Sequence, residues 1–121
     1  MAKCLIIDDN PSNRMVARFI MEDLGLEVGE GGSVEESLTM VASGEYAVIL
    51  LDWMMPEIDG IEFLELLRES AEGKKIKVIM CTAKDGLANV QAALSAGADA
   101  YIQKPITSSI AEEKLRALGV I

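Results

Sequence analysis

The most informative stretch of the sequence is residues 47–52, which read Ala47-Val48-Ile49-Leu50-Leu51-Asp52. Its apolar residues are consecutive rather than alternating, which indicates a β-strand buried on both faces, as in parallel sheets. Residues 3–8 and 76–82 form two further runs of the same kind. We therefore expect these three strands to lie at the centre of a parallel sheet.

The segments around these runs predict the rest of an α/β fold. Residues 26–30 and 100–103 are two shorter strand candidates, and Gly29 interrupts the first of them, which is typical of an edge strand. Amphipathic stretches separate the strands, so the chain predicts a doubly wound, five-stranded parallel sheet flanked by five helices. Right-handed crossovers leave few strand orders, and of these we favour 2-1-3-4-5.

The expected helices are marked at both ends. Their starts are indicated by Asn10 before Pro11, by capping boxes of Ser33 with Glu36 and of Asp59 with Glu62, and by single caps at Asp85 and Thr107. Glycines that can adopt the left-handed conformation follow the helical patterns, at Gly25, Gly44, Gly73, Gly97 and Gly119. Apolar spacing predicts two buried helix faces, one of Val16, Phe19, Ile20 and Leu24 and one of Ala111, Leu115 and Leu118.

Composition narrows the class of protein. A length of 121 residues suits one domain over residues 1–121, and a net charge of −9 argues against nucleic-acid binding. No apolar run approaches the roughly 20 residues that cross a bilayer, and no leader is visible, so we expect a cytoplasmic protein without membrane insertion. Histidine is absent, and Cys4 and Cys81 lie in apolar segments as small hydrophobic groups. Any chemistry must therefore use carboxylates, lysines and hydroxyls.

Polar residues stand where the expected strands end. Asp8 and Asp9 close the first run, Asp52 the third and Thr82 the fourth, and Lys104 follows the fifth. Each has an ordinary explanation by itself, such as a solvated acid or a surface cation, but the predicted strand order brings all of them to one crevice. Three adjacent carboxylates repel one another unless a cation compensates, which predicts Mg²⁺, with Lys104 offsetting the remaining negative charge. Asp52, on a rigid strand, is best placed to act as the nucleophile.

Over essentially its whole length the sequence resembles response-regulator receiver domains. The matching elements are Ile7-Asp8-Asp9-Asn10-Pro11, Leu51-Asp52-Trp53-Met54-Met55-Pro56 with Asp59-Gly60, Cys81-Thr82-Ala83, Ala96-Gly97-Ala98-Asp99-Ala100-Tyr101, and Lys104-Pro105. The length and the C-terminal residues are most similar to single-domain regulators of the chemotaxis type. The resemblance implies two-component signal transduction by a stand-alone monomer, which catalyses only its own phosphorylation and dephosphorylation and is not otherwise an enzyme.

The resemblance also implies a role for each site residue. Asp52 would accept a phosphoryl group from a sensor histidine kinase, from a histidine phosphotransfer domain or from a small acyl phosphate. Asp9 would bind Mg²⁺ directly, Asp8 through water, and Met54 through its backbone carbonyl. Lys104 would bind the phosphoryl oxygen, and its bond to Pro105 would be cis.

Switching residues are implied in the same way. Thr82 would hydrogen-bond to the phosphoryl group, and Tyr101 would then turn inward. The helix after Asp85, the strand at residues 100–103 and the helix after Thr107 would form the face that binds a downstream protein.

Two positions depart from a common family pattern and leave alternatives open. Met54 and Lys84 stand two places after Asp52 and Thr82, beside the path of the hydrolytic water. A methionine cannot orient that water, so we expect slow self-dephosphorylation, while Lys84 offers a second phosphate contact. Alternative functions are a phosphate sink, a phosphorelay shuttle and an unphosphorylated scaffold. A Mg²⁺-dependent aspartyl-phosphate phosphatase and a flavodoxin-like electron carrier fit less well, because the first lacks its second carboxylate and the second would need a phosphate loop at Asp8 and Asp9.

Overall fold

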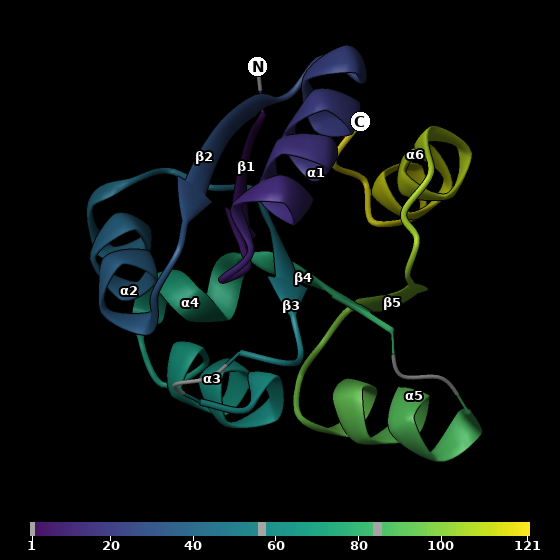
Figure 1. Cartoon of the computed structure of the whole chain (residues 1–121). Helices are drawn as coiled ribbons and strands as arrows, with labels where there is room; N and C mark the ends of the chain where they lie inside the picture. Colours follow the sequence, from purple (N-terminus) through teal and green to yellow (C-terminus); the bar gives the residue numbers. More distant parts are fainter. Residues whose placement is uncertain (1, 56–57, 84–85) are drawn as a thin grey trace.

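The structure is a computed structural model that describes residues 2–55, 58–83 and 86–121. Its centre is one parallel sheet in the order β2-β1-β3-β4-β5 (Figure 1). The strands are β1 (Lys3–Ile7), β2 (Glu27–Gly31), β3 (Val48–Asp52), β4 (Lys77–Thr82) and β5 (Ala100–Gln103). The predicted fold class and strand order are therefore confirmed, with β2 at an edge and β1, β3 and β4 inside.

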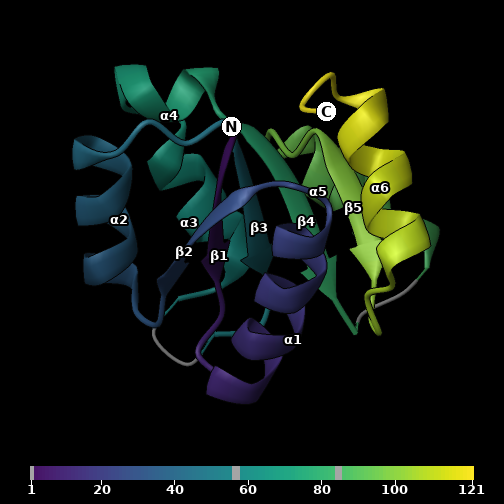
Figure 2. The same ribbon diagram turned by 90° about the horizontal axis from the view of Figure 1, so that it is seen from above.

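Helices cover both faces of the sheet. They are α1 (Pro11–Asp23), α2 (Val34–Ser43), α3 (Gly60–Leu67), α4 (Ala71–Lys75), α5 (Leu87–Ser95) and α6 (Ser108–Ala117). Ala17 and Met21 of α1 share one core cluster with Ala111 and Leu115 of α6, whereas α2, α3 and α5 contribute to the other cluster. Figure 2 accordingly shows α1 and α6 on one side of the sheet and α2, α3 and α4 on the other.

Between β3 and β4 the described residues form two helices where one was expected. Helix α3 ends at Leu67, and the short α4 begins after Ser70, whose hydroxyl oxygen accepts from the Gly73 amide at 2.9 Å. Gly73 therefore lies inside a helix instead of ending one. Arg68 stabilises this break, because its guanidinium donates to the carbonyl oxygens of Gly73, Ile76 and Gly97 at 2.6–3.3 Å. The expectation of five helices was wrong, since these polar contacts leave no periodic trace in the sequence.

The predicted buried face of α1 was also wrong in part. Ala17 and Met21 are the buried residues, whereas 50% of Val16 and 77% of Phe19 is exposed; Ile20 and Leu24 are half-buried. Helix α1 carries two apolar stripes, and the stripe with the small Ala17 lies against the sheet because it allows close approach. The second predicted face is confirmed at Ala111 and Leu115, and Leu118 is half-buried against the same cluster.

Most predicted helix caps are present. Asn10, Ser33, Asp59 and Thr107 each accept a hydrogen bond from a backbone amide in the first turn. Both capping boxes differ from the predicted pattern. Glu36 accepts from the amide of Gly32 instead of that of Ser33, and Asp59 accepts from the amide of Ile61 instead of that of Glu62. Left-handed glycines follow three helices, at Gly25, Gly97 and Gly119, but Gly44 has a φ of −109°. Asp85 lies outside the described residues.

None of the described helices is long and apolar enough to cross a bilayer.

The turn after β3 leaves room only for glycine at position 60. A Cβ atom there would lie 2.6 Å from the Cα atom of Trp53, and the Gly60 amide donates to the Trp53 carbonyl at 2.8 Å. We expect Gly60→Ala to lower the free energy of unfolding by about 1–3 kcal/mol, although alanine is the better helix former. Urea denaturation measures this effect. The control is Glu62→Ala in the same helix, which should change stability by less than about 0.5 kcal/mol; equal effects of the two substitutions would contradict the steric explanation.

Candidate functional site

The predicted polar residues meet at the carboxyl edge of the sheet. Asp8 follows β1, Asp52 ends β3, Thr82 ends β4, and Lys104 follows β5. The Lys104 amide continues the ladder by donating to the Thr82 carbonyl at 2.8 Å. Because strand order and register are set by the buried apolar residues, the polar side chains are carried to this edge by the packing of the core.

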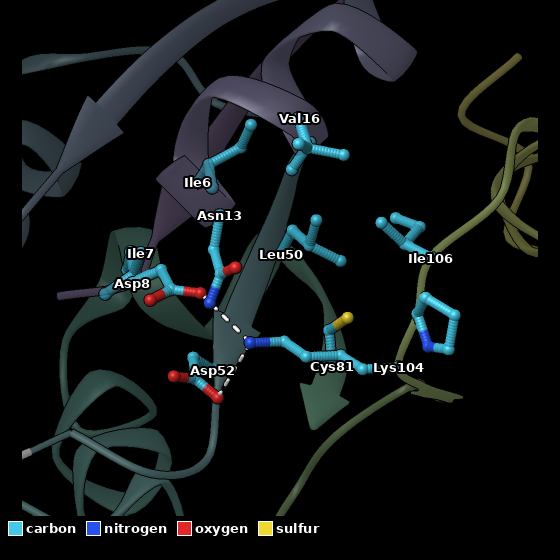
Figure 3. Close-up of a pocket in the computed structure, with 12 residues that line it drawn as sticks. Ile6, Ile7, Asp8, Asn13, Val16, Leu50, Asp52, Cys81, Lys104 and Ile106 are labelled. Atoms are coloured by element: carbon cyan, nitrogen blue, oxygen red, sulfur yellow. Dashed lines mark hydrogen bonds and ion pairs between the residues drawn. The ribbon is translucent and has the colours of Figure 1, made fainter. Parts of the chain in front are cut away.

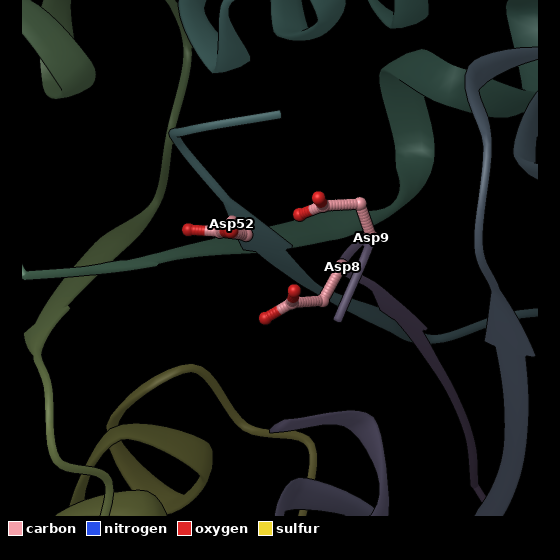
Figure 4. Close-up of side chains that lie close together, drawn as sticks. All are labelled: Asp8, Asp9 and Asp52. Atoms are coloured by element: carbon pink, nitrogen blue, oxygen red, sulfur yellow. The ribbon is translucent and has the colours of Figure 1, made fainter. Parts of the chain in front are cut away.

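Three carboxylates lie together at this edge. One oxygen from each of Asp8, Asp9 and Asp52 lies within 4.8 Å of the others (Figure 4). Asp8 and Asp52 are buried, at 5% and 8% exposure, whereas Asp9 is exposed. The cluster therefore has two buried acids and one acid that faces solvent.

Lys104 is the cation of the cluster. Its Nζ atom is 3.2 Å from Oδ2 of Asp8 and 3.5 Å from Oδ1 of Asp52 (Figure 3). Burial by itself would lower the pKa of Lys104, but Asp52 and Asp8 more than offset this, so its pKa is raised and the ammonium stays charged. Burial raises the pKa of Asp52, the Lys104 ammonium lowers it, Asp8 raises it, and the net direction is upward.

Backbone amides and one arginine hold the acids in place. Oδ1 of Asp8 accepts from the Asn10 amide at 2.9 Å, and Oδ1 of Asp52 accepts from the Met54 amide at 3.3 Å. Nη1 of Arg14 donates to the Asp8 carbonyl at 2.6 Å, while its Nε atom pairs with Glu30 at 3.2 Å. Sequence reasoning missed Arg14. Its position one turn after the helix start, facing back toward Asp8, was the available signal.

The donor set fits a hard divalent cation. An octahedral Mg²⁺ ion takes oxygen ligands at about 2.0–2.1 Å, which places adjacent ligands roughly 3 Å apart and opposite ligands roughly 4 Å apart, and it retains several waters. The spacing in the acid cluster, with one acid exposed, suits such an ion with part of its water shell. Asp9 and Asp52 would hold it, with Asp8 nearby.

The remaining predicted residues differ in their burial and in their distance from this cluster. Thr82 is fully buried, Tyr101 is half-buried on β5, and both make interactions within the protein. The Met54 side chain is 61% exposed, and its backbone pairs with Asp59. The Lys104–Pro105 peptide bond is cis. Pro56 and Lys84 lie outside the described residues.

Both thiols are buried, as predicted. Burial raises the pKa of Cys4 to about 12 and that of Cys81 to about 11. Neither thiol is poised to react as a thiolate at neutral pH.

Comparison with known proteins agrees with this geometry. Residues 4–116 match the family described as response regulator receiver domain. The chain is 34% identical over 120 residues to chemotaxis protein CheY1 of Helicobacter pylori, covering 96% of this chain and 95% of that protein.

Solved structures are similar over nearly the whole chain. Chemotaxis protein CheY4 of Vibrio cholerae superposes with a TM-score of 0.91 at 27% identity, covering 98% of both chains. A receiver domain protein described as CheY-like from Methanospirillum hungatei superposes with a TM-score of 0.86 at 31% identity, covering 99% of this chain and 95% of that one. The chain belongs to the response regulator receiver domain family and is a protein of two-component signalling.

Proposed function

We propose that the chain is a phosphorylation switch in which Asp52 accepts a phosphoryl group in a Mg²⁺-dependent reaction. The observation that carries the proposal is the position of Lys104, whose ammonium contacts both Asp8 and Asp52 at the acid cluster. A structural lysine needs only one such partner. A lysine shared between two buried acids beside a third acid suits a site that must admit a further anion.

Each residue of the cluster has a task in the transfer. Asp52 attacks in its ionised form, held by β3 and by the Met54 amide. The Lys104 ammonium then turns from the carboxylates to a phosphoryl oxygen. Bound Mg²⁺ would supply the charge that lets the acids and the incoming phosphoryl group coexist. The chain thus catalyses its own modification and acts as a switch, not as an enzyme on an external substrate.

The switch would act through Thr82 and Tyr101. Thr82 ends β4 beside Asp52 on β3, so a phosphoryl group on Asp52 would offer its hydroxyl a new acceptor. Tyr101 lies on β5, where it lines a groove between α5 and α6 together with Leu94 and Leu118. A phosphoryl group that favours one arrangement of this groove shifts the population of the binding-competent state.

The partners follow from this assignment. We propose a sensor histidine kinase or a histidine phosphotransfer domain as donor, and a downstream protein that binds α5, β5 and α6. A chemotaxis-type role in the cytoplasm is favoured by the similarity to chemotaxis proteins over whole chains. A phosphate sink or a relay shuttle would use the same site, and the difference between these roles would lie in the partner.

Incubation with acetyl phosphate and Mg²⁺ tests the phosphoacceptor. Intact-mass spectrometry should find one labile phosphoryl adduct on the wild-type chain and none on Asp52→Asn, because an amide is not a nucleophile for this transfer. The matched control is Asp23→Asn, which removes an exposed carboxylate of α1 and should keep the adduct. An adduct on Asp52→Asn, or none on the wild type, would refute the assignment.

The exposed Met54 side chain predicts slow loss of the phosphoryl group. A thioether cannot orient the hydrolytic water, whereas an amide two places after Asp52 can. We expect Met54→Asn to release phosphate severalfold faster than the wild type, measured as decay of the adduct after removal of the donor. Met54→Leu, which has no polar atom either, serves as the control and should decay like the wild type. Equal or slower decay of the asparagine variant would count against this explanation.

A further inference from the structure

A cavity of about 250 Å³ opens beside the acid cluster (Figure 3). Its polar end is formed by Asp8, Asn13, Asp52 and Lys104. Its remaining walls are mainly apolar and come from β1, β3, β4, α1 and the segment before α6, with Val16, Ala17, Leu50 and Ile106 among the lining residues. The cavity thus offers one charged end and one apolar end.

This polarity suits a small amphiphilic ligand. With the metal bound, the Lys104 end favours an anionic head group, and the apolar end favours a hydrocarbon chain. One water molecule takes up about 30 Å³ in the liquid, so the cavity has room for several methylene groups. Reaction with a small phosphodonor does not require an apolar chamber of this size, because a phosphoryl group needs only the charged end.

We propose that this cavity binds the alkyl chain of an acyl phosphate, so that the chain reacts faster with propionyl and butyryl phosphate than with acetyl phosphate. The inference rests on the proposed function, since it places the phosphoryl group beside Asp52. It adds a selectivity for the donor that depends on Val16, Ala17 and Ile106.

The direction of the transfer agrees with the position of the cavity. Asp52 and Leu50 stand two residues apart on β3, so their side chains leave the same face of the sheet, toward α1. An oxygen of Asp52 forms the new bond to phosphorus while the bond from phosphorus to the acyl oxygen breaks. The electron pair leaves with the carboxylate product, and no proton or redox partner is needed. In an in-line transfer the leaving group departs on the side of the phosphoryl group opposite Asp52. Helix α1 and the segment before α6 both line the cavity that Asp52 lines, so they can surround the departing alkyl chain.

The size of the effect follows from burial of the alkyl chain. Each methylene group taken from water strengthens binding roughly fourfold. The two additional methylenes of butyryl phosphate should therefore raise the second-order rate constant roughly fifteenfold over acetyl phosphate, with propionyl phosphate between the two. Phosphoramidate has no acyl chain, so its rate measures phosphoryl transfer at the charged end of the cavity without any contribution from the apolar end.

The test compares these four donors on the wild type and on variants that fill the cavity. Val16→Phe adds bulk at a half-exposed position that lines the cavity, and Ala17→Leu fills it from the buried side of α1. In both variants we expect the three acyl phosphates to react at similar rates, with the phosphoramidate rate unchanged. Met15→Phe is the matched control, because Met15 is a 64% exposed neighbour on α1 outside the cavity wall, and it should keep the preference.

The results distinguish failure of the proposed donor selectivity from failure of Asp52 as the phosphoacceptor. If wild-type protein reacts with all three acyl phosphates at equal rates, or if Val16→Phe keeps the preference for butyryl phosphate, the cavity has no such role. If no donor modifies Asp52, the phosphoacceptor assignment itself fails. An unchanged phosphoramidate rate in Val16→Phe shows that a lost preference does not come from misfolding.

Discussion

The ammonium of Lys104 between the buried carboxylates of Asp8 and Asp52 is the interaction on which the site depends. Asp8 and Asp52 are each less than a tenth exposed, so little water screens the repulsion between their carboxylates. An exposed pair such as Arg116 with Glu112, with side chains 63% and 43% exposed, contributes only about 0.3–0.5 kcal/mol. Removing one partner from a buried cluster costs on the order of 3–5 kcal/mol, so the charges at this edge matter far more than those on the surface.

The register of the central strands brings Lys104 and Asp52 together. Lys104 follows β5 and Asp52 ends β3, and β4 separates the two strands, so the distance between the two side chains depends on the register of three strands. The apolar residues of β3 and β4 hold that register, because a slip by one residue would turn buried side chains outward. Two further contacts limit how far the acids can move. The Gly60 amide closes the turn after β3, and Arg14 donates to the Asp8 carbonyl.

Much of this could be predicted from the sequence, and the failures share a cause. Unbroken apolar runs indicated the sheet, and the polar residues that end them, Asp8, Asp52 and Thr82, indicated the site. Both could be predicted because a strand buried on both faces shows in the sequence as consecutive apolar residues. The break at Arg68, the orientation of α1 around Ala17 and the contact of Arg14 with Asp8 were missed. They depend on polar contacts between distant segments, or on which of two apolar stripes packs more closely. The cavity was missed for the same reason, since segments far apart in the sequence, from β1 to the residues before α6, form its walls.

We propose that the acid cluster of Asp8, Asp9 and Asp52 binds one divalent cation, whose charge Lys104 supplements. Trp53 is the only tryptophan of the chain and directly follows Asp52, so its fluorescence should report binding at the cluster. A titration with Mg²⁺ is the most direct measurement. We expect a saturable change in fluorescence with one ion per chain, and an affinity for Mg²⁺ that is at least about tenfold weaker in Asp9→Asn. A signal that does not saturate, or an Asp9→Asn variant that titrates like the wild type, would contradict it.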